Sequence, residues 1–386
     1  MEARSQTSAV TGDRSFPVVF ENKTQGRWGD GQIYITVLGQ ASPGHWSYLR
    51  PDGTLKPIDH RDADAPGHLE KNGRNYPNMS FTIEEAPTVQ MPLPRLEGAR
   101  MYISAGSPMY IPVSEDDSGW GGPDLHNPLD PNADVYYDWY EFTYAYGDGS
   151  PVPFGGNTTQ VDMFGIPLTA RLQQASTAYD QTVGIILARD QGFAQYASSV
   201  GPAYQSLAGE YRIVAPRSSA AFDRGGEYGD VLQPAIDAAW EQWGAASGFT
   251  LARLNQTFSG RVVDGQLCFT KDGQGPHSLD KPTTADVVQC AGALVPLEPD
   301  KIVERELGAE LAAAFNRGVA SDTGTWYQPG DYYAHEPSND YAGFFHLISI
   351  DHRAYGFPYD DVNDQSSVKI LPNAEPPSAL TIGIGW

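Results

Sequence analysis

Gln32-Ile-Tyr-Ile-Thr-Val-Leu-Gly39 is a strong β-strand pattern, because β-branched and aromatic residues fill most of its positions. Similar apolar runs lie on both sides of it, at residues 16–20, 99–105 and 134–146. Turn-forming clusters such as Pro51-Asp-Gly53 stand between the runs, and the whole chain is rich in glycine, proline and tyrosine. Short strands separated by turns predict a mostly β fold, organised as a β-sandwich or barrel.

The pattern changes near residue 180. Residues 182–188 are typical of a buried strand, and helical patterns follow. In one of them, Ile236, Trp240 and Trp243 recur at i, i+4 and i+7 and so share one helix face. Apolar stripes of this kind pack against a core, so this part of the chain predicts a mixed α/β fold.

These patterns divide the chain into domains. The polar residues 1–15 are predicted to be disordered, residues 16–180 to form the first β domain, and residues 181–335 to form the mixed α/β domain. Residues 336–386 return to aromatic, turn-rich sequence and end in Leu380-Thr-Ile-Gly-Ile-Gly-Trp386. That alternating run predicts a closing strand that completes the first domain, which makes the α/β region an insertion.

The charge of the chain restricts its partners. There are 25 Lys and Arg residues against 48 Asp and Glu, so the net charge is −23. Such a field repels phosphate backbones and anionic lipid surfaces, which argues against nucleic-acid binding and membrane binding. No uninterrupted apolar run is as long as the roughly 18 residues that a membrane-spanning helix needs. A neutral polysaccharide meets no such repulsion and is the favoured partner, although acidity can also serve solubility alone.

Motifs for cofactors and metals are absent from the sequence. There is no P-loop, no dinucleotide fingerprint after a strand, no nucleophile elbow and no H-E-x-x-H. The two cysteines, Cys268 and Cys290, have no paired His/Cys spacing that suggests a zinc site. Both lie in patterns that predict strands, and both a disulfide and two free thiols remain open. We expect no metal and no cofactor.

The first 16 residues are polar and lack the apolar segment of a secretory signal. Either a signal was removed and Met1 was added, or the chain is not conventionally exported, and the sequence leaves both open.

Glu141 is the first candidate for catalysis. It belongs to Asp134-Val-Tyr-Tyr-Asp-Trp-Tyr-Glu-Phe-Thr-Tyr144, where the period of two places Tyr137, Trp139, Glu141 and Thr143 on one strand face. A charged carboxylate is costly to bury among aromatic side chains, which favours its protonated form. Glycoside hydrolysis needs a protonated carboxyl beside the leaving oxygen. Glu141 is therefore a candidate general acid, unless it is an ordinary exposed strand residue.

Asp162 is the second candidate. It follows the polar run Asn157-Thr-Thr-Gln160, which could keep its carboxylate ionised and bind sugar hydroxyls. The run that precedes Asp162 and the strand of Glu141 could be antiparallel neighbours, which would place both carboxylates in one cleft. Trp139, Tyr144 and Phe154 could offer faces to pyranose rings. Other interpretations stay open, because Asp162 could be a turn or cap residue and other carboxylates compete with the pair: Asp134, Asp138, Asp360 and Asp361.

The flanking segments carry a resemblance that covers nearly the whole chain. Asp130–Thr143 and Asn157–Asp162 resemble glycoside hydrolase family 64, the β-1,3-glucanases that release laminaripentaose. Ile33–Gly39, Asn339–Ala342 and Tyr355–Asn363 agree with the same family. The resemblance implies a thaumatin-like β domain plus a mixed α/β domain, with a wide cleft between them. It also implies a monomeric, extracellular enzyme.

The resemblance implies a role for individual residues. Glu141 matches the family's general acid in its E-F-T motif, and Asp162 matches the general base in its V-D motif, for an inverting mechanism. Thr143 and Thr159 match positions that contact glucan, and Phe154 is the best match for a sugar-contacting aromatic residue. Asn157 and Trp139 complete the expected substrate-binding set.

Two departures concern the expected cleft. Residues 148–153 resemble an insertion between the two carboxylates, within the connection 144–156, and Ala145 stands where the family has a polar residue. Product length therefore stays open. The alternative function is a non-catalytic, glucan-binding thaumatin-like protein, although such proteins are usually rich in disulfides.

Overall fold

The computed structural model describes residues 15–86, 91–145 and 153–386, and the chain divides into two compact units. Unit 1 holds the chain up to Thr158, Gly165–Gln191 and Val368–Trp386; unit 2 holds Thr159–Phe164 and Gly192–Ser367. The predicted disordered residues 1–15 lie outside the described part of the chain except for Ser15. Most of the connection between the two candidate carboxylates, residues 146–152, lies outside it as well.

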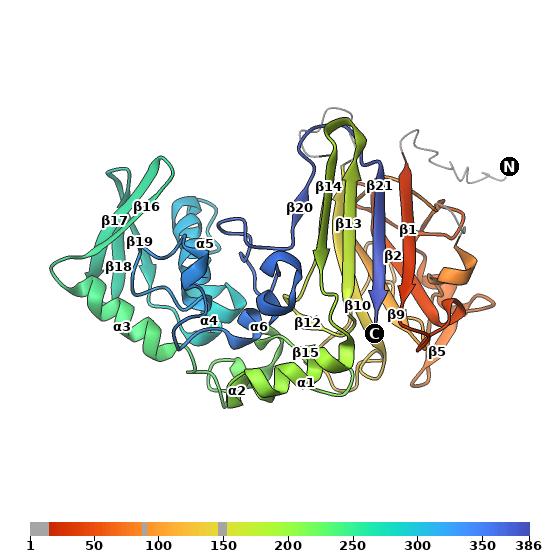
Figure 1. Cartoon of the computed structure of the whole chain (residues 1–386), viewed down its shortest axis with the longest axis horizontal. Coiled ribbons are helices and arrows are strands. Elements are labelled where there is room, and N and C mark those ends of the chain that lie inside the picture. The colour runs from red at the N-terminus through yellow and green to blue at the C-terminus, as the bar shows by residue number, and fades with distance from the viewer. Residues whose placement is uncertain (1–14, 87–90, 146–152) are drawn as a thin grey trace. The chain divides into compact units, whose positions relative to one another are not determined.

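Two sheets form the framework of unit 1 (Figure 1). The first has the order β14 (Tyr179–Gly184), β13 (Leu168–Gln174), β21 (Ala379–Gly385), β1 (Phe16–Lys23) and β8 (Met91–Leu93). The second has the order β20 (Lys369–Ile370), β11 (Phe154–Thr158), β10 (Tyr136–Tyr144), β9 (Leu96–Ala105), β2 (Ile33–Ser42), β3 (His45–Leu49) and β4 (Leu55–Pro57), with β7 (Phe81–Thr82) beside β2. A separate hairpin joins β5 (Leu69–Lys71) and β6 (Arg74–Tyr76).

The core of unit 1 lies between these two sheets. Ile33, Ile35 and Val37 of β2 point into it at alternate positions, as do Leu380 and Ile382 of β21. One continuous cluster therefore receives side chains from both sheets, which is the arrangement of a β-sandwich. The four strands expected in the first part of the chain are present as β1, β2, β9 and β10, so the mostly β prediction is confirmed.

The expected closing strand is β21, and it lies inside the first sheet. It pairs in parallel with β1, where Phe20 faces Ile382, and antiparallel with β13, where Ala170 faces Ile382. The last strand of the chain thus joins the first strand to a later one.

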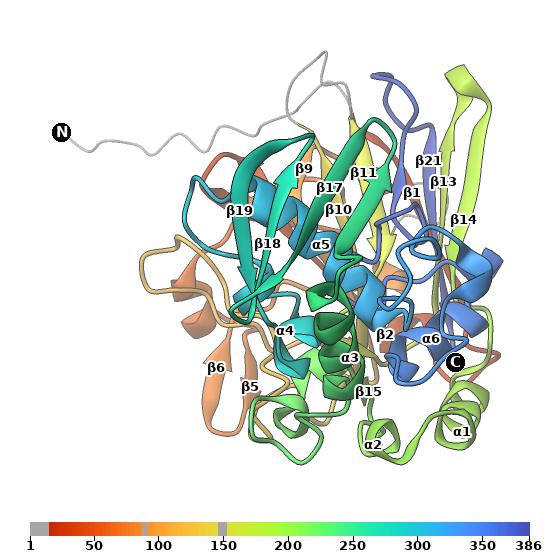
Figure 2. The same ribbon diagram turned by 90° about the vertical axis from the view of Figure 1, so that its left-hand side faces the viewer.

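Unit 2 combines helices with a four-stranded antiparallel sheet (Figure 2). The sheet has the order β16 (Phe249–Arg253), β17 (Gln256–Val263), β18 (Gln266–Lys271) and β19 (Gln274–Asp280). The helices of this part of the chain are α1 (Arg189–Ser199), which begins in unit 1, α2 (Pro202–Gln205), α3 (Gln233–Gly244), α4 (Thr284–Gln289), α5 (Ile302–Asn316) and α6 (Asp340–Ile348). A two-stranded pair joins β12 (Met163–Phe164) and β15 (Ile213–Val214).

The helical stripe predicted from the sequence is the buried face of α3. Ile236, Trp240 and Trp243 are all buried, and the Trp243 ring lies 4.9 Å from that of Phe249 on β16. Helix α3 contacts β17 and helix α5 contacts β19, so both helices cover the four-stranded sheet.

Residues 336–367 belong to unit 2, whereas the sequence assigned them to the first domain. Helix α6 explains the difference, because its aromatic side chains pack within unit 2. The Phe345 ring lies 5.1 Å from Phe164, and the Tyr341 ring lies 6.2 Å from Tyr196. A turn-rich aromatic sequence does not reveal which of two cores its side chains will enter.

The prediction of a strand at Cys290 is wrong. Val287 and Val288 are buried on helix α4, which Thr283 caps by accepting from the backbone N–H of Asp286, and Cys290 ends the helix in a left-handed conformation. Cys268 lies on β18 as expected, and both thiols are free.

None of the described helices combines the length and apolar character needed to cross a membrane.

Candidate active site

Glu141 lies in the central part of β10, between two strands of the second sheet. The register pairs it with Arg100 of β9 on one side and with Asn157 of β11 on the other. Tyr140 and Phe142 belong to the core cluster, so Glu141 projects from the opposite face of the sheet. The strand of Glu141 (β10) and the run that precedes Asp162 (β11) are antiparallel neighbours, which confirms the expected pairing.

One oxygen of the Glu141 carboxylate accepts both hydrogen bonds that the group receives from the described residues. Arg100 Nε donates to Oε1 over 3.1 Å, and the indole Nε1 of Trp139 donates to the same oxygen over 3.1 Å. The Glu141 side chain is 30% exposed. The interpretation of Glu141 as a carboxyl buried among aromatic side chains is therefore wrong, because it is half-buried, open to solvent and paired with a cation.

Glu141 lines a pocket of about 460 Å³ that lies entirely within unit 1. Polar residues, apolar residues and glycines line this pocket together: Gly98, Ala99, Arg100, Glu141, Phe142, Thr143, Gly155, Gly156, Asn157, Val368 and Ile370. Ile370 is half exposed, and Gly155 places no side chain beside Thr143. A sugar presents hydroxyl groups and apolar C–H faces together, so a lining of this composition suits it.

Two residues of the predicted substrate-binding set lie in this pocket. Asn157 is buried, and its side-chain oxygen Oδ1 has no hydrogen-bond partner among the described residues. A buried acceptor without a partner is uncommon, and a ligand hydroxyl would satisfy it. Thr143 is exposed at the pocket, where its Oγ1 accepts from the backbone N–H of Gly98 over 3.2 Å.

Phe154 and Trp139 do not offer a face to a ligand, contrary to the sequence-based prediction. Phe154 is 0% exposed in the core, where its ring stacks on Phe142 and meets the edge of Phe16. Trp139 is 4% exposed, with Tyr137 stacked at 6.3 Å and the Arg100 guanidinium 5.4 Å from its ring. Trp139 acts on the site through its indole N–H instead.

Asp162 lies in unit 2, in the bend before β12 and beyond the end of β11. Its backbone oxygen accepts from Ala215 over 2.9 Å, which anchors the bend. Its carboxylate Oδ1 lies 3.5 Å from Nη1 of Arg217, and its side chain is 26% exposed. Asp162 is therefore an accessible carboxylate beside a cation.

The polar run before Asp162 is largely turned inward. Thr159 is only 2% exposed, and its hydroxyl accepts from the backbone N–H of Val161 over 3.1 Å. The backbone of Gln160 makes two hydrogen bonds: its N–H donates to the backbone oxygen of Tyr355, and its carbonyl oxygen accepts from the Tyr341 hydroxyl. In this structure Thr159 holds the bend, so the prediction that it contacts sugar is not supported.

The two buried rival carboxylates have structural roles. Asp138 accepts from the backbone N–H groups of Gly165 and Ile166 at 2.9 and 3.3 Å. Asp360 is fully buried between Arg317 at 3.2 Å and His346 at 2.8 Å. Burial alone would raise the pKa of Asp360, but the two cations lower it below its ordinary value.

The two exposed rivals are not held in this way. Asp134 pairs with Lys71, and Asp361 is exposed.

Sequence reasoning missed the arginine that lies beside each of the two candidate carboxylates. Arg100 lies in a run that reads only as an apolar strand, and its relation to Glu141 depends on the cross-strand register of β9 and β10. Arg217 follows β15, which pairs with β12 next to Asp162. The one sequence signal for Arg100 was a charged residue within an apolar strand. No signal in the sequence indicated that Arg217 would lie beside Asp162.

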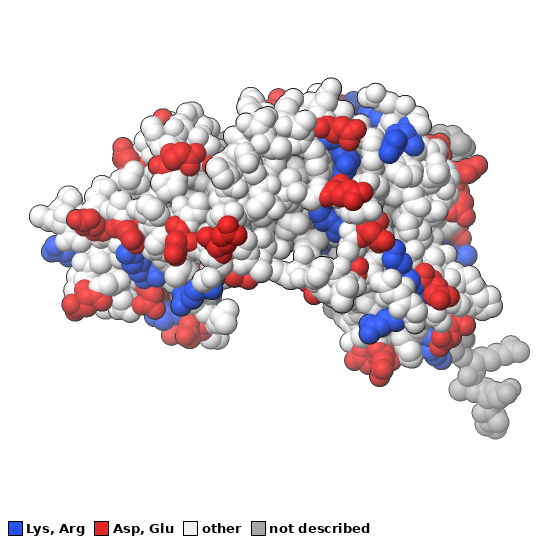
Figure 3. Space-filling model, turned by 90° about the horizontal axis from the view of Figure 1, so that it is seen from below, with Lys and Arg blue, Asp and Glu red and all other residues white. Residues whose placement is uncertain are grey.

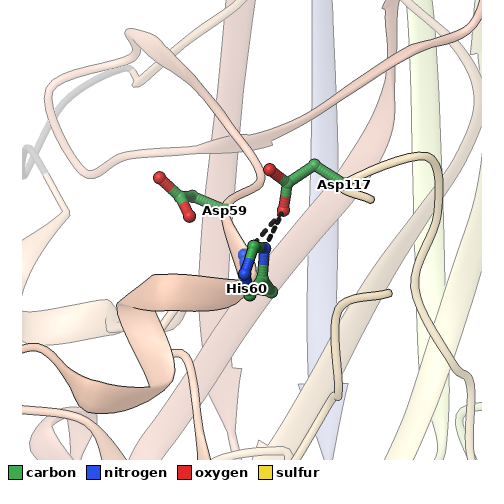
Figure 4. A group of neighbouring side chains, drawn as sticks. All are labelled: Asp59, His60 and Asp117. Carbon is green, nitrogen blue, oxygen red and sulfur yellow. Dashed lines mark hydrogen bonds and ion pairs between the residues drawn. The ribbon is translucent and has the colours of Figure 1, made fainter. Parts of the chain in front are cut away.

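Among the described residues, Asp59, His60 and Asp117 of unit 1 lie as close together as the ligands of a metal ion would (Figure 4). Asp117 Oδ1 accepts from the backbone N–H and from Nδ1 of His60, at 2.7 and 3.0 Å. Arg61 binds the carboxylate of Asp59 through two nitrogen atoms and lowers its pKa to about 2. The carboxylates of this group thus already have partners, and their arrangement does not require a metal ion.

The excess of acidic residues does not form one continuous patch on the face that Figure 3 shows. Acidic and basic side chains are interspersed there. This distribution agrees with a charge that serves solubility.

Comparisons with known proteins point in one direction. The family model described as β-1,3-glucanase, glycoside hydrolase family 64, matches residues 14–384. A crystal structure of a β-1,3-glucanase domain from Clostridium beijerinckii is 30% identical, with a TM-score of 0.86 over 96% of this chain and 98% of that one. A laminaripentaose-producing β-1,3-glucanase from Paenibacillus barengoltzii, crystallised with laminarihexaose, is 31% identical, with a TM-score of 0.76 over 100% of this chain and 78% of that one.

A curated relative, a glucan endo-1,3-beta-glucosidase of Cellulosimicrobium cellulans, is 25% identical over 354 residues and 88% of this chain. The chain spans 61% of the length of that relative.

Proposed function

The chain belongs to the β-1,3-glucanase family, glycoside hydrolase family 64, as its sequence predicted, and we propose that it cleaves internal bonds of β-1,3-glucan by an inverting mechanism. Membership confirms the predicted enzyme class, a glycoside hydrolase. The observation that carries the proposal is the pocket of unit 1, where the half-exposed Glu141 lies beside an unpaired amide oxygen of Asn157. The similar enzyme from Paenibacillus barengoltzii was crystallised with a laminari-oligosaccharide, which supports a glucan as the ligand.

In the proposed reaction Glu141 is the general acid and Asp162 the general base. Glu141 donates its proton to the glycosidic oxygen while the bond from that oxygen to C1 breaks. Asp162 takes a proton from a water molecule, whose oxygen attacks C1 from the opposite face of the sugar. The Arg217 guanidinium lies 3.5 Å from Oδ1 of Asp162 and pairs with its carboxylate. No metal ion takes part in this scheme.

We also propose that unit 1 is the thaumatin-like domain of the family and that a wide substrate cleft brings the two carboxylates together. Asp162 follows Asn157, the register partner of Glu141, by only five positions, so the chain itself limits their separation. An inverting pair requires carboxyl groups roughly 6.5–9.5 Å apart. A crystal structure with bound laminari-oligosaccharide tests this, and a separation beyond about 12 Å would count against the pairing.

Laminaripentaose is the proposed main product, because the similar Paenibacillus enzyme is described as producing it. We propose further that the enzyme acts outside the cell, since β-1,3-glucans are polymers that do not enter cells intact, and that it is a monomer. Size-exclusion chromatography with light scattering tests the monomer.

The deciding experiment is incubation with laminarin or curdlan, with the products resolved by length and by anomeric form. We expect laminari-oligosaccharides whose initial anomer is α, whereas initial β-anomers would refute inversion. Glu141→Gln and Asp162→Asn should each abolish turnover without changing the far-UV circular dichroism spectrum. Binding of laminarin without any hydrolysis by the wild type would favour a non-catalytic glucan-binding protein.

A further inference from the structure

The two donors on Glu141 converge on one of its two oxygen atoms. Arg100 Nε and Trp139 Nε1 both donate to Oε1. Within the described residues no hydrogen bond to the other oxygen, Oε2, is found, and Glu141 lines the open pocket. The carboxyl group therefore has one occupied oxygen and one available oxygen.

This asymmetry decides where a proton can sit. An oxygen that accepts two N–H groups has its lone pairs engaged and serves as the carbonyl end of a protonated carboxyl group. The proton then belongs on Oε2. Resting on the proposed function, we infer that Arg100 and Trp139 are positioning residues that reserve Oε2 of Glu141 as the oxygen that donates the proton to the glycosidic bond.

Packing contacts hold both donors in place. The Trp139 ring is buried, stacked on Tyr137, so its N–H has a fixed direction. The Arg100 guanidinium lies 5.4 Å from the centre of the same ring, and its side chain is about two-thirds covered, with 36% exposed. Arg100 thus contacts both the acid and the second donor, and the three side chains form one unit.

The chemical step balances with these roles. The O–H bond at Oε2 breaks as its proton passes to the glycosidic oxygen, and the electron pair of the C1–O bond leaves with that oxygen as an alcohol. Water supplies the new bond at C1 and gives its proton to Asp162. Glu141 remains as a carboxylate, and the positive charge of Arg100 beside Oε1 stabilises it.

Substrates that do not need acid assistance test this inference. A 2,4-dinitrophenolate leaving group departs without protonation, so a dinitrophenyl laminari-oligosaccharide bypasses the acid. We expect Arg100→Met and Trp139→Phe to lower kcat on laminarihexaose by about 10- to 100-fold, a part of the full contribution of a general acid. On the dinitrophenyl substrate the loss should stay within about threefold, with KM little changed on either substrate.

Arg95→Met is the matched control. Arg95 also lies over an aromatic ring, 5.3 Å from Tyr144, and donates to the backbone oxygen of Ala145, whereas the hydrogen bonds to Glu141 found within the described residues come from Arg100 and Trp139. It should keep wild-type kcat on both substrates. Trp139→Phe keeps an aromatic ring but removes the indole N–H together with the second ring, so its fold is checked by circular dichroism, and it remains informative if Arg100→Met does not fold.

The outcomes separate the two proposals. If the wild type does not hydrolyse laminarihexaose, or Glu141→Gln keeps its activity, the proposed function fails. If Glu141→Gln is inactive but Arg100→Met and Trp139→Phe lose equally on both substrates, or lose nothing, the positioning roles are refuted. A neutron crystal structure at acidic pH gives a direct reading, in which a deuteron on Oε1 of Glu141 would overturn the inference.

Discussion

Asp360 joins two buried cations of unit 2, and its replacement by asparagine should destabilise that unit strongly. Its carboxylate is 0% exposed, with Oδ1 accepting from Arg317 over 3.2 Å and Oδ2 accepting from His346 over 2.8 Å. Asparagine is close in size but leaves both cations without a counter-ion. Removing one partner of a buried ion pair costs about 3–5 kcal/mol. For a unit of this size the melting midpoint should fall by roughly 10 °C.

The loss should depend on pH in a direction that His346 sets. Burial opposes the charge on His346, but Asp360 raises its pKa above the ordinary value of 6.5. A group with a raised folded-state pKa stabilises the fold fully below its unfolded pKa, and this contribution disappears as the pH rises through the folded-state pKa. Asp360, with its lowered pKa, contributes above pH 3.8 and loses its contribution as the pH falls through its folded-state value. The difference between wild type and Asp360→Asn should therefore be largest near about pH 5–6 and smaller in alkaline solution.

Urea unfolding followed by circular dichroism and tryptophan fluorescence, at several pH values, measures this difference. Asp361→Asn is the matched control, because the neighbouring carboxylate is exposed, and its free energy of unfolding should change by less than about 0.5 kcal/mol. A loss below about 1 kcal/mol in Asp360→Asn near pH 5–6, or a loss that grows as the pH rises above about 6.5, would refute the reasoning.

Two further predictions concern backbone packing and thiol access. Gly308→Ala should destabilise unit 2 by about 1–3 kcal/mol in urea unfolding, because a Cβ there would lie 1.7 Å from the Leu294 oxygen, whereas Gly330→Ala, with open space around it, should be nearly neutral. Burial raises the pKa of the Cys290 thiol, so Ellman's reagent should modify Cys268 first in the native protein and reach Cys290 only on unfolding. Equal rates at both thiols would contradict that order.

The strands were predictable because their signal is local. In β2, Ile33, Ile35 and Val37 alternate as a half-buried strand requires, and the helical spacing of Trp240 and Trp243 marks the buried face of α3. The strand at Cys290 was predicted wrongly because a short apolar run fits a helix as well as a strand. There the capping box decides, through Thr283 and Asp286.

The environment of the site was less predictable, because it depends on contacts between strands. Trp139 and Phe154 have the composition of sugar-stacking residues, yet the register of β10 with β9 and with β11 commits the faces of both rings to packing within the protein. The register of β9 and β10 also brings Arg100 to Glu141. A tryptophan that binds sugar and one that orients a carboxylate have the same signature in a single sequence, so only tertiary structure separates them.

What distinguishes the candidate catalytic carboxylates from the buried rivals is how completely their oxygens are engaged. Asp138 and Asp360 are buried, and both oxygens of each accept hydrogen bonds from within the protein. Glu141 keeps one oxygen toward an open pocket, and Asp162 is 26% exposed beside Arg217. A carboxyl group that must give or take a proton needs an oxygen that substrate or water can reach, whereas a structural carboxylate is most stable when every acceptor is used. Glu141 and Asp162 are therefore supported as the catalytic pair by one shared physical property: each lies beside an arginine, and each keeps part of its carboxylate accessible.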